Sequence, residues 1–139
     1  MNYLLDTCII SELIKPKPNS KVIKWLRSCR EESLFLSSLT IGEIQKGISK
    51  LSESRKKNEL QTWLDVELAL RFDRRILGID IAVAKKWGDI QASSELAGNK
   101  MPVVDSFIAS IGIVHDLTVV TRNTADMKPS GVTLLNPWD

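Results

Sequence analysis

The sequence predicts a single α/β domain with a central, mainly parallel sheet and helices on both faces. Short apolar runs alternate with amphipathic segments along the whole chain, a pattern typical of parallel strands joined by helices. The length of 139 residues suits one compact domain. No repeat, low-complexity tract or linker divides the chain, so we expect one domain over residues 1–139.

The first half of the chain is expected to hold two strands and four helices. The apolar run at 3–5 ends at an acid and predicts a buried strand, and a second apolar run lies at 34–36. The helices are predicted from apolar spacing and from capping residues. In order, they are a short helix ending before Pro16, a helix capped by Ser20, a helix capped by Ser37, Ser38 or Thr40 with an apolar stripe reaching Leu51, and a long, largely exposed helix over 53–74.

The second half continues the alternation. Residues 76–79 are predicted as a brief strand or an extended link, and two further strands are expected at 117–120 and 132–135. Asp80 is a candidate N-cap for a helix that stops near Gly98. Pro102 suits the first position of the next helix, which ends near His115.

The overall composition excludes several classes of protein. An apolar content of 43% and a charged content of 26% are ordinary for a globular domain, and no apolar run approaches the roughly 20 residues that cross a bilayer. The first residues lack the basic start of a secretory signal, so we expect a cytoplasmic protein without a membrane partner. Cys8 and Cys29 have no metal-ligand spacing and are expected to be reduced and partly buried.

Basic residues are concentrated in one segment although the net charge is only +2. Six basic residues and no acid lie between Lys15 and Arg30. In a helix there, Val22, Trp25, Leu26 and Cys29 share one face, and Lys21, Lys24, Arg27 and Arg30 lie on the opposite side. The stripe fits either a phosphate-binding surface or an ordinary solvated helix face.

Four acids are expected near one edge of the predicted sheet, where open parallel sheets bind their ligands. Asp6 ends the first strand, and Asp126 lies just beyond the strand at 117–120. Glu43 and Asp105 lie in the first turns of helices that leave the sheet. Clustered carboxylates repel one another, and their oxygen atoms suit Mg²⁺ or Mn²⁺. A cation held there can activate water and stabilise charge on a phosphodiester.

Each of these acids also has a purely structural explanation. Asp6 can cap the following helix. Thr40 and Glu43 match a capping box, in which the glutamate only bonds the backbone. Asp105 meets a helix dipole favourably, and Asp126 is a possible turn residue. Position alone leaves both interpretations open.

Other kinds of site are excluded by missing residues. The chain has no glycine fingerprint for a dinucleotide and no phosphate-binding loop of the Walker type. His115 is the single histidine, which excludes a catalytic triad and a multi-histidine zinc site; its expected place is a helix end. The four tryptophans mostly occupy apolar stripes and are interpreted as core residues.

Four segments resemble the motifs of PIN-domain proteins, in the order of that family. They are Leu4–Leu13, which opens with Asp6-Thr7-Cys8 where Asp-Thr-Asn is more usual; Ser38–Ile44; Met101–Ala109; and His115–Met127, where Met127 stands in place of Phe. Asn136-Pro137-Trp138 also resembles the end of the VapC-like and FitB-like branch. The resemblance covers essentially the whole chain.

This resemblance implies a metal-dependent endoribonuclease that is the toxin of a toxin–antitoxin pair. Its expected ligands for Mg²⁺ or Mn²⁺ are Asp6, Glu43, Asp105 and Asp126. Thr7, Thr121 and Asn123 are expected around them, on the metal-bound water or a phosphate. The implied partners are an RNA substrate, a cognate antitoxin and a second copy of the chain. One alternative is a catalytically inactive PIN-like module that binds RNA or protein. Another is a phosphotransfer domain, which would need an acid beside Asp6 and a late lysine where Arg122 stands.

Overall fold

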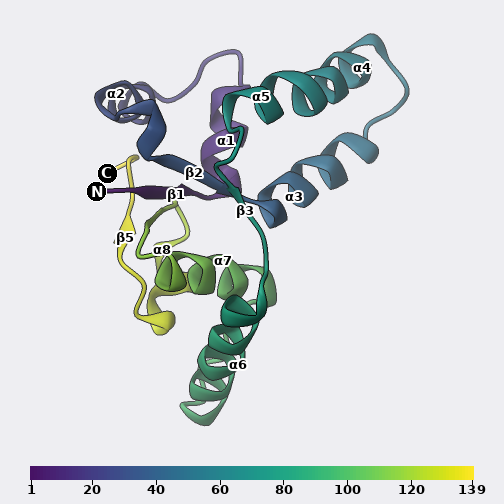
Figure 1. Ribbon diagram of the computed structural model, residues 1–139. Helices are drawn as coiled ribbons and strands as arrows, with labels where there is room; N and C mark the ends of the chain where they lie inside the picture. The colour runs from purple at the N-terminus through teal and green to yellow at the C-terminus, as the bar shows by residue number, and fades with distance from the viewer.

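Five strands form the centre of the structure, a computed structural model that describes all 139 residues (Figure 1). Along the sheet the strands follow the order β3-β2-β1-β4-β5, and every neighbouring pair is parallel. Their bounds are β1 Tyr3–Leu5, β2 Leu34–Ser37, β3 Ile76–Leu77, β4 Thr118–Val120 and β5 Leu134–Leu135. The expected mainly parallel sheet is therefore confirmed, with all pairs parallel.

Helices cover both faces of this sheet, as the sequence predicted (Figure 1). Their bounds are α1 Thr7–Leu13, α2 Ser20–Ser28, α3 Ser38–Ser49, α4 Arg55–Thr62, α5 Ala69–Arg71, α6 Ile81–Leu96, α7 Val103–Val114 and α8 Thr124–Met127. Helices α1 to α5 lie on one side of the sheet, with α3 and α4 projecting as a pair, and α6 and α7 lie on the other side. None of these helices has the length and apolar character needed to cross a membrane.

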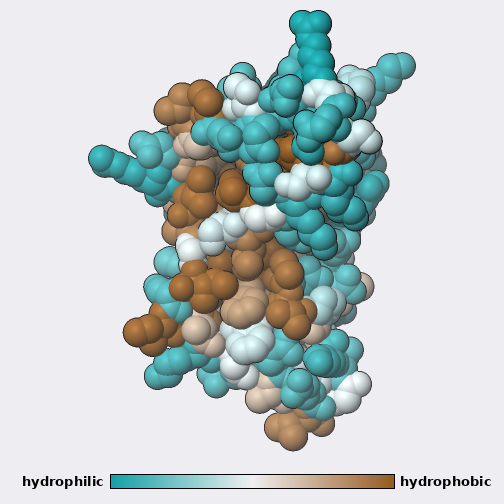
Figure 2. All heavy atoms as spheres, turned by 90° about the vertical axis from the view of Figure 1, so that its right-hand side faces the viewer, coloured by the Kyte–Doolittle hydropathy of each residue, from teal (hydrophilic) through white to brown (hydrophobic).

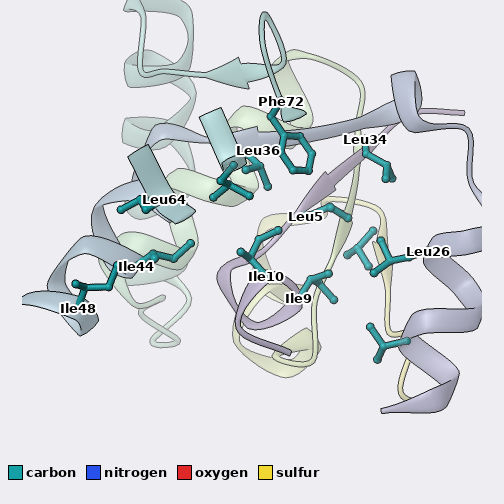
Figure 3. Close-up of a cluster of buried hydrophobic side chains, with 13 residues drawn as sticks. Leu5, Ile9, Ile10, Leu26, Leu34, Leu36, Ile44, Ile48, Leu64 and Phe72 are labelled. Atoms are coloured by element: carbon teal, nitrogen blue, oxygen red, sulfur yellow. The ribbon is translucent and has the colours of Figure 1, made fainter. Parts of the chain in front are cut away.

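Each face of the sheet has its own hydrophobic core. Successive strand residues point to opposite faces, so Leu4 packs against α6 and α7 whereas Leu5 packs against α1 and α2. Val119 and Val120 of β4 divide in the same way. Figure 3 shows the core around Leu5, where side chains from β2, α1, α2 and α3 converge with Phe72. These two cores fix the helices that carry the candidate site.

Several predicted helix ends are corrected by the structure. Asn19, not Ser20, caps α2, because its side chain accepts hydrogen bonds from the backbone of Lys21 and Val22. Pro102 is the N-cap of α7 rather than its first residue. Leu51 lies beyond the end of α3 and is exposed instead of joining the core stripe.

The predicted helix over 53–74 is shorter and less regular than expected. It begins at Arg55 and ends at Arg71, and residues Trp63–Leu68 form a π-helical stretch between α4 and α5. Leu64 and Leu68 of this stretch are buried in the core of Figure 3, while most other side chains of the segment are exposed. This stretch contacts α3 and keeps the helix continuous between α4 and α5.

Glycines act at two points that orient the helices of the second half. Gly98 follows α6 with φ of 69°, the left-handed conformation that ends many helices. Gly112 lets α7 approach β4, because a Cβ atom there would lie 2.8 Å from Cγ2 of Val119. Close docking of α7 on the sheet places the start of that helix, including Asp105, beside the carboxyl ends of the central strands.

A candidate metal centre of four carboxylates

Asp6 lies at the carboxyl end of β1 and is the most firmly held of the four acids. It is 3% exposed. Oδ1 accepts a hydrogen bond from the backbone N–H of Thr7 at 2.8 Å, so Asp6 does cap α1. Oδ2 accepts a hydrogen bond from the buried hydroxyl of Thr121 at 2.7 Å, across the β1–β4 pair. Both oxygens are therefore oriented by protein donors.

Glu43 lies on α3 and faces α1. Its Oε1 accepts a hydrogen bond from the Thr7 hydroxyl at 2.6 Å, and the same hydroxyl lies 3.1 Å from Oγ1 of Thr40. The capping-box interpretation of Glu43 is wrong, because Ser37 caps α3 by accepting from the backbone N–H of Thr40. Glu43 is thus left with an exposed side chain that accepts from Thr7 on α1 instead of capping its own helix.

Asp105 lies in the first turn of α7, where its charge meets the helix dipole as predicted. This turn is held by its neighbour Ser106, which is fully buried. The Ser106 hydroxyl accepts hydrogen bonds from Nε1 of Trp87 at 2.9 Å and Nε2 of Gln91 at 2.7 Å, both on α6. The carboxylate of Asp105, half-buried, accepts no hydrogen bond from the protein.

Asp126 and Asn123 lie at the outer edge of the site. Asp126 is in the single turn of α8 and is exposed, and its carboxylate has no hydrogen-bond donor. Asn123 precedes α8, and its backbone N–H donates to the Thr121 hydroxyl at 2.9 Å. That hydroxyl is fully buried and engaged with Asp6, so its role is to orient a carboxylate.

The negative charges of the four acids act on one another. The pKa of Asp105 is raised to about 6, first by burial and then by the negative charges of Asp6, Asp126 and Glu43. The pKa of Asp6 is also raised, mainly by burial and further by Glu43, although hydrogen bonds from Thr121 and Thr7 oppose the shift. Repulsion of this kind is relieved by a bound cation.

The donor set fits a hard divalent cation that keeps part of its water shell. All four side chains offer carboxylate oxygens, the ligands that Mg²⁺ and Mn²⁺ prefer. No group of three or more His, Cys, Asp or Glu side chains is already arranged so that it could hold a metal ion. A site that holds Mg²⁺ through one or two carboxylates and several waters does not need such a cluster in advance.

Cys8 occupies the position next to Asp6 and Thr121, where the resembled family more often has asparagine. Its Sγ lies 3.9 Å from Oδ2 of Asp6 and 3.7 Å from Oγ1 of Thr121, and it accepts from the backbone N–H of Arg122 at 3.4 Å. Burial raises the pKa of the Cys8 thiol. The thiol therefore packs as a neutral, weakly bonding group, and both cysteines are free and partly buried as expected.

Sequence reasoning missed several residues that position the site. Thr40, Gln91 and Ser106 are buried and hydrogen-bonded behind Glu43 and Asp105, and each is a polar residue within or beside an apolar stripe. Such interruptions are a usable signal, because buried polar groups are normally paired. The tryptophans are only partly buried, so their interpretation as core residues is too simple.

Fold and site together define a class: an α/β protein with an all-parallel sheet and four acids near its carboxyl edge, Asp6, Glu43, Asp105 and Asp126, which we name the carboxylate pocket. The family model of the PIN domain matches residues 3–128 of the chain. The chain belongs to the PIN domain family.

Two relatives and one solved structure extend nearly over the full length. The toxin FitB of Neisseria gonorrhoeae is 36% identical over 135 residues, covering 97% of each chain. The VapC ribonuclease Y4jK of Sinorhizobium fredii is 29% identical over 136 residues, covering 98% of this chain and 97% of the relative. The crystal structure of FitAcB from Neisseria gonorrhoeae superposes with a TM-score of 0.93 at 36% identity, covering 98% of each chain.

Proposed function

We propose that the protein is a metal-dependent endoribonuclease that uses Asp6, Glu43, Asp105 and Asp126 to hold Mg²⁺ or Mn²⁺. The observation that carries this proposal is the placement of the acids, because Thr7 and Thr121 hold the carboxylates of Asp6 and Glu43 at the carboxyl edge of the sheet. Side chains that repel one another at a ligand-binding edge are costly without a cation. The ribonuclease name of one relative supports RNA as the substrate.

Each acid has a distinct part in this proposal. Asp6 and Asp105 bind the cation most directly, and Asp126 completes the acidic pocket. Glu43, exposed and held at one oxygen by Thr7, positions or deprotonates the attacking water. Thr121 keeps Asp6 oriented. The cation, when bound, lowers the pKa of water and offsets negative charge on the scissile phosphate.

Cleavage of a pooled bacterial RNA by the purified protein tests this function. We expect discrete cuts with Mg²⁺ or Mn²⁺ that disappear with chelator and in Asp105→Asn. Asp89→Asn is the matched control, because Asp89 is an exposed aspartate on α6 away from the four acids. A well-folded protein that cuts no RNA pool with either cation would instead favour a PIN-like binding module.

We also propose a toxin role with a cognate antitoxin as partner, which the toxin name of the FitB relative supports. An apolar groove of about 200 Å³ between α1, α3 and α4 fits a segment of that partner. Its lining includes Ile14, Leu51 and Trp63, and Thr7 and Glu43 lie along it. A segment seated there would cover Glu43, and an arginine in it would pair with the carboxylates.

The groove is tested with the product of a small neighbouring open reading frame. Gly47 lines the groove with free space around it, so Gly47→Arg is expected to block the partner's segment. Gly88→Arg on α6 is the control, since that glycine also has free space but lies outside the groove. Equal partner binding by both variants would remove the groove from the proposal.

A homodimer is proposed from a second apolar surface. Figure 2 shows apolar side chains gathered on the face that carries α3, α4 and the link from β3 to α6. Ile79 in that link, Ile81 at the start of α6 and Val103 at the start of α7 are large, exposed apolar residues. The mass in solution tests the dimer, and Ile81→Lys is expected to shift it toward the monomer.

A further inference from the structure

Four basic residues around α2 are exposed, and none of them forms a salt bridge. Lys21, Lys24 and Arg27 are exposed on α2, and Lys17 is exposed just before it. None of the four takes part in the salt bridges of the molecule, which instead use Lys15, Arg30, Arg55, Lys57, Arg71 and Arg75. The positive charge of this helix is therefore available to a ligand.

The same side of α2 borders a hollow of about 550 Å³. Lys21, Lys24 and Ser28 of α2 form one wall, and Asn136 and Pro137 of the C-terminal segment form the other. Trp25 lines this hollow and also a second one of about 320 Å³, which continues past Ser28 toward Arg30. A charged, hollowed surface with a shared aromatic wall differs from an ordinary solvated helix face.

Arg122 connects this surface to the carboxylate pocket. Its guanidinium stacks over the Trp138 ring at 4.7 Å, within the C-terminal segment that borders the hollow. Its backbone N–H bonds Cys8 beside Asp6, so the residue stands at the rim of the pocket.

Glu12 contacts the residue that precedes α2. The carboxylate of Glu12, buried, accepts from the Asn19 backbone N–H at 2.9 Å and from Nζ of Lys15 at 3.0 Å. Glu12 belongs to α1, which begins beside Asp6, so this contact holds the start of α2 against the helix next to the pocket. The basic surface thus starts at the pocket and runs along α2.

We propose that α2, Arg122 and the C-terminal segment form a track that binds the phosphate backbone of single-stranded RNA next to the cut. This inference rests on the proposed function for its substrate class. Lys21, Lys24 and Arg27 contact phosphates, and Trp25 and the Arg122–Trp138 pair offer flat surfaces on which bases stack. Asp139 is the one acid that lines the larger hollow, where it faces two lysines.

Salt dependence of RNA binding tests the track without requiring cleavage. The affinity of the protein for a labelled single-stranded RNA is measured in chelator at several salt concentrations. We expect Lys21→Gln/Lys24→Gln to bind several-fold more weakly and to reduce the log–log salt slope by about 1.4, the loss of two phosphate contacts. Lys85→Gln/Lys100→Gln removes the same charge from the α6 side and is expected to keep the slope.

The cleavage assay adds a second readout that separates this inference from the proposed function. On a long RNA the α2 double variant is expected to raise KM with kcat unchanged, and on an RNA too short to reach α2 it is expected to behave as wild type. A protein that cuts no RNA but shows the reduced salt slope would refute the proposed cleavage and support the track. An unchanged salt slope of RNA binding in a folded α2 variant overturns the track. If that variant instead loses binding to an acidic protein, the basic surface is a protein-binding site and the track is again overturned.

Discussion

The two halves of the carboxylate pocket are built differently. Asp6 and Glu43 lie where β1, α1 and α3 meet, and protein donors hold them through Thr121 and Thr7. Asp105 and Asp126, on α7 and α8, have carboxylates with no protein donor. The fold thus orients one half in advance and leaves the other half with uncompensated charge.

The two halves therefore differ in whether they need a bound cation. Hydrogen bonds fix the side chains of the held half, Asp6 and Glu43, in place without a ligand. Only a cation or a cationic partner group can relieve the repulsion in the open half. We therefore expect substitutions in the two halves to have similar effects on activity but opposite effects on stability.

The largest expected effect comes from removing one charge in either half. Asp105→Asn is expected to reduce RNA cleavage by about 100-fold or more, as loss of a preorganised charged contact does in active sites. It should also raise the melting temperature of the metal-free protein, because repulsion within the pocket falls. Cleavage assays and melting curves in chelator measure both.

Asp6→Asn provides the contrast within the held half. RNA cleavage by this variant should fall as far as that by Asp105→Asn. In addition, the new amide NH₂ would face either the Thr7 N–H or the Thr121 hydroxyl, both of which donate to Asp6 in the wild type. We expect the free energy of unfolding to drop by about 1 kcal/mol. Wild-type cleavage in both variants would refute the assigned site, and equal stability changes would refute the comparison.

A smaller effect is expected from the donor behind Asp6. Thr121→Val removes the hydrogen bond to a buried carboxylate, which should cost about 2 kcal/mol of stability and reduce cleavage roughly tenfold. Thr118→Val is the matched control, since Thr118 is also buried in β4 but its hydroxyl makes no hydrogen bond. Similar denaturation curves for the two variants would show that the Thr121 hydroxyl does not stabilise Asp6.

The open half should also respond to pH. The pKa of Asp105 in the folded chain is about 6, above the value of about 3.9 for an unfolded aspartate. The folded state therefore binds more protons, and the stability from this group, present below pH 4, is lost as the pH rises to about 6. In chelator, the melting temperature of wild type should fall relative to Asp105→Asn across this window. A constant difference between the two would contradict the shift.

The smallest effect is expected at Cys8. Its sulfur contacts with Asp6 and Thr121 are long and weak, at 3.9 and 3.7 Å. Cys8→Ser should change stability by less than about 0.5 kcal/mol, with cleavage staying close to that of wild type. A large loss of cleavage in a folded variant would mean that the thiol takes part in the chemistry.

The sequence predicted the parallel sheet and the residues at its carboxyl edge because both depend on local patterns. Apolar alternation located β1 and β4, and the acids after strands and at helix starts followed from it. The partners of those acids were not predictable. The Thr7–Glu43 bond joins residues 36 positions apart, and the Ser106 hydroxyl meets Trp87 and Gln91 only after α6 packs on α7. Contacts of this kind depend on tertiary packing, which periodicity does not record.

Local competition explains the errors at helix ends. Ser37 and Thr40 are both good caps three residues apart, and the earlier one caps α3 by accepting from the backbone N–H of the later one. Asn19 and Ser20 compete in the same way, and the bond from the Asn19 backbone to Glu12 favours Asn19. These corrections matter for function, because they free Glu43 from a capping role.

Direct titration of the metal-free protein with Mn²⁺ and Mg²⁺, followed by calorimetry and by melting temperature, tests the carboxylate pocket most directly. We predict saturable binding that raises the melting temperature of wild type and is lost in Asp105→Asn but kept in Asp89→Asn. Absence of binding to folded wild type, together with RNA cleavage that persists in chelator, would contradict the assignment of these four acids as a metal centre.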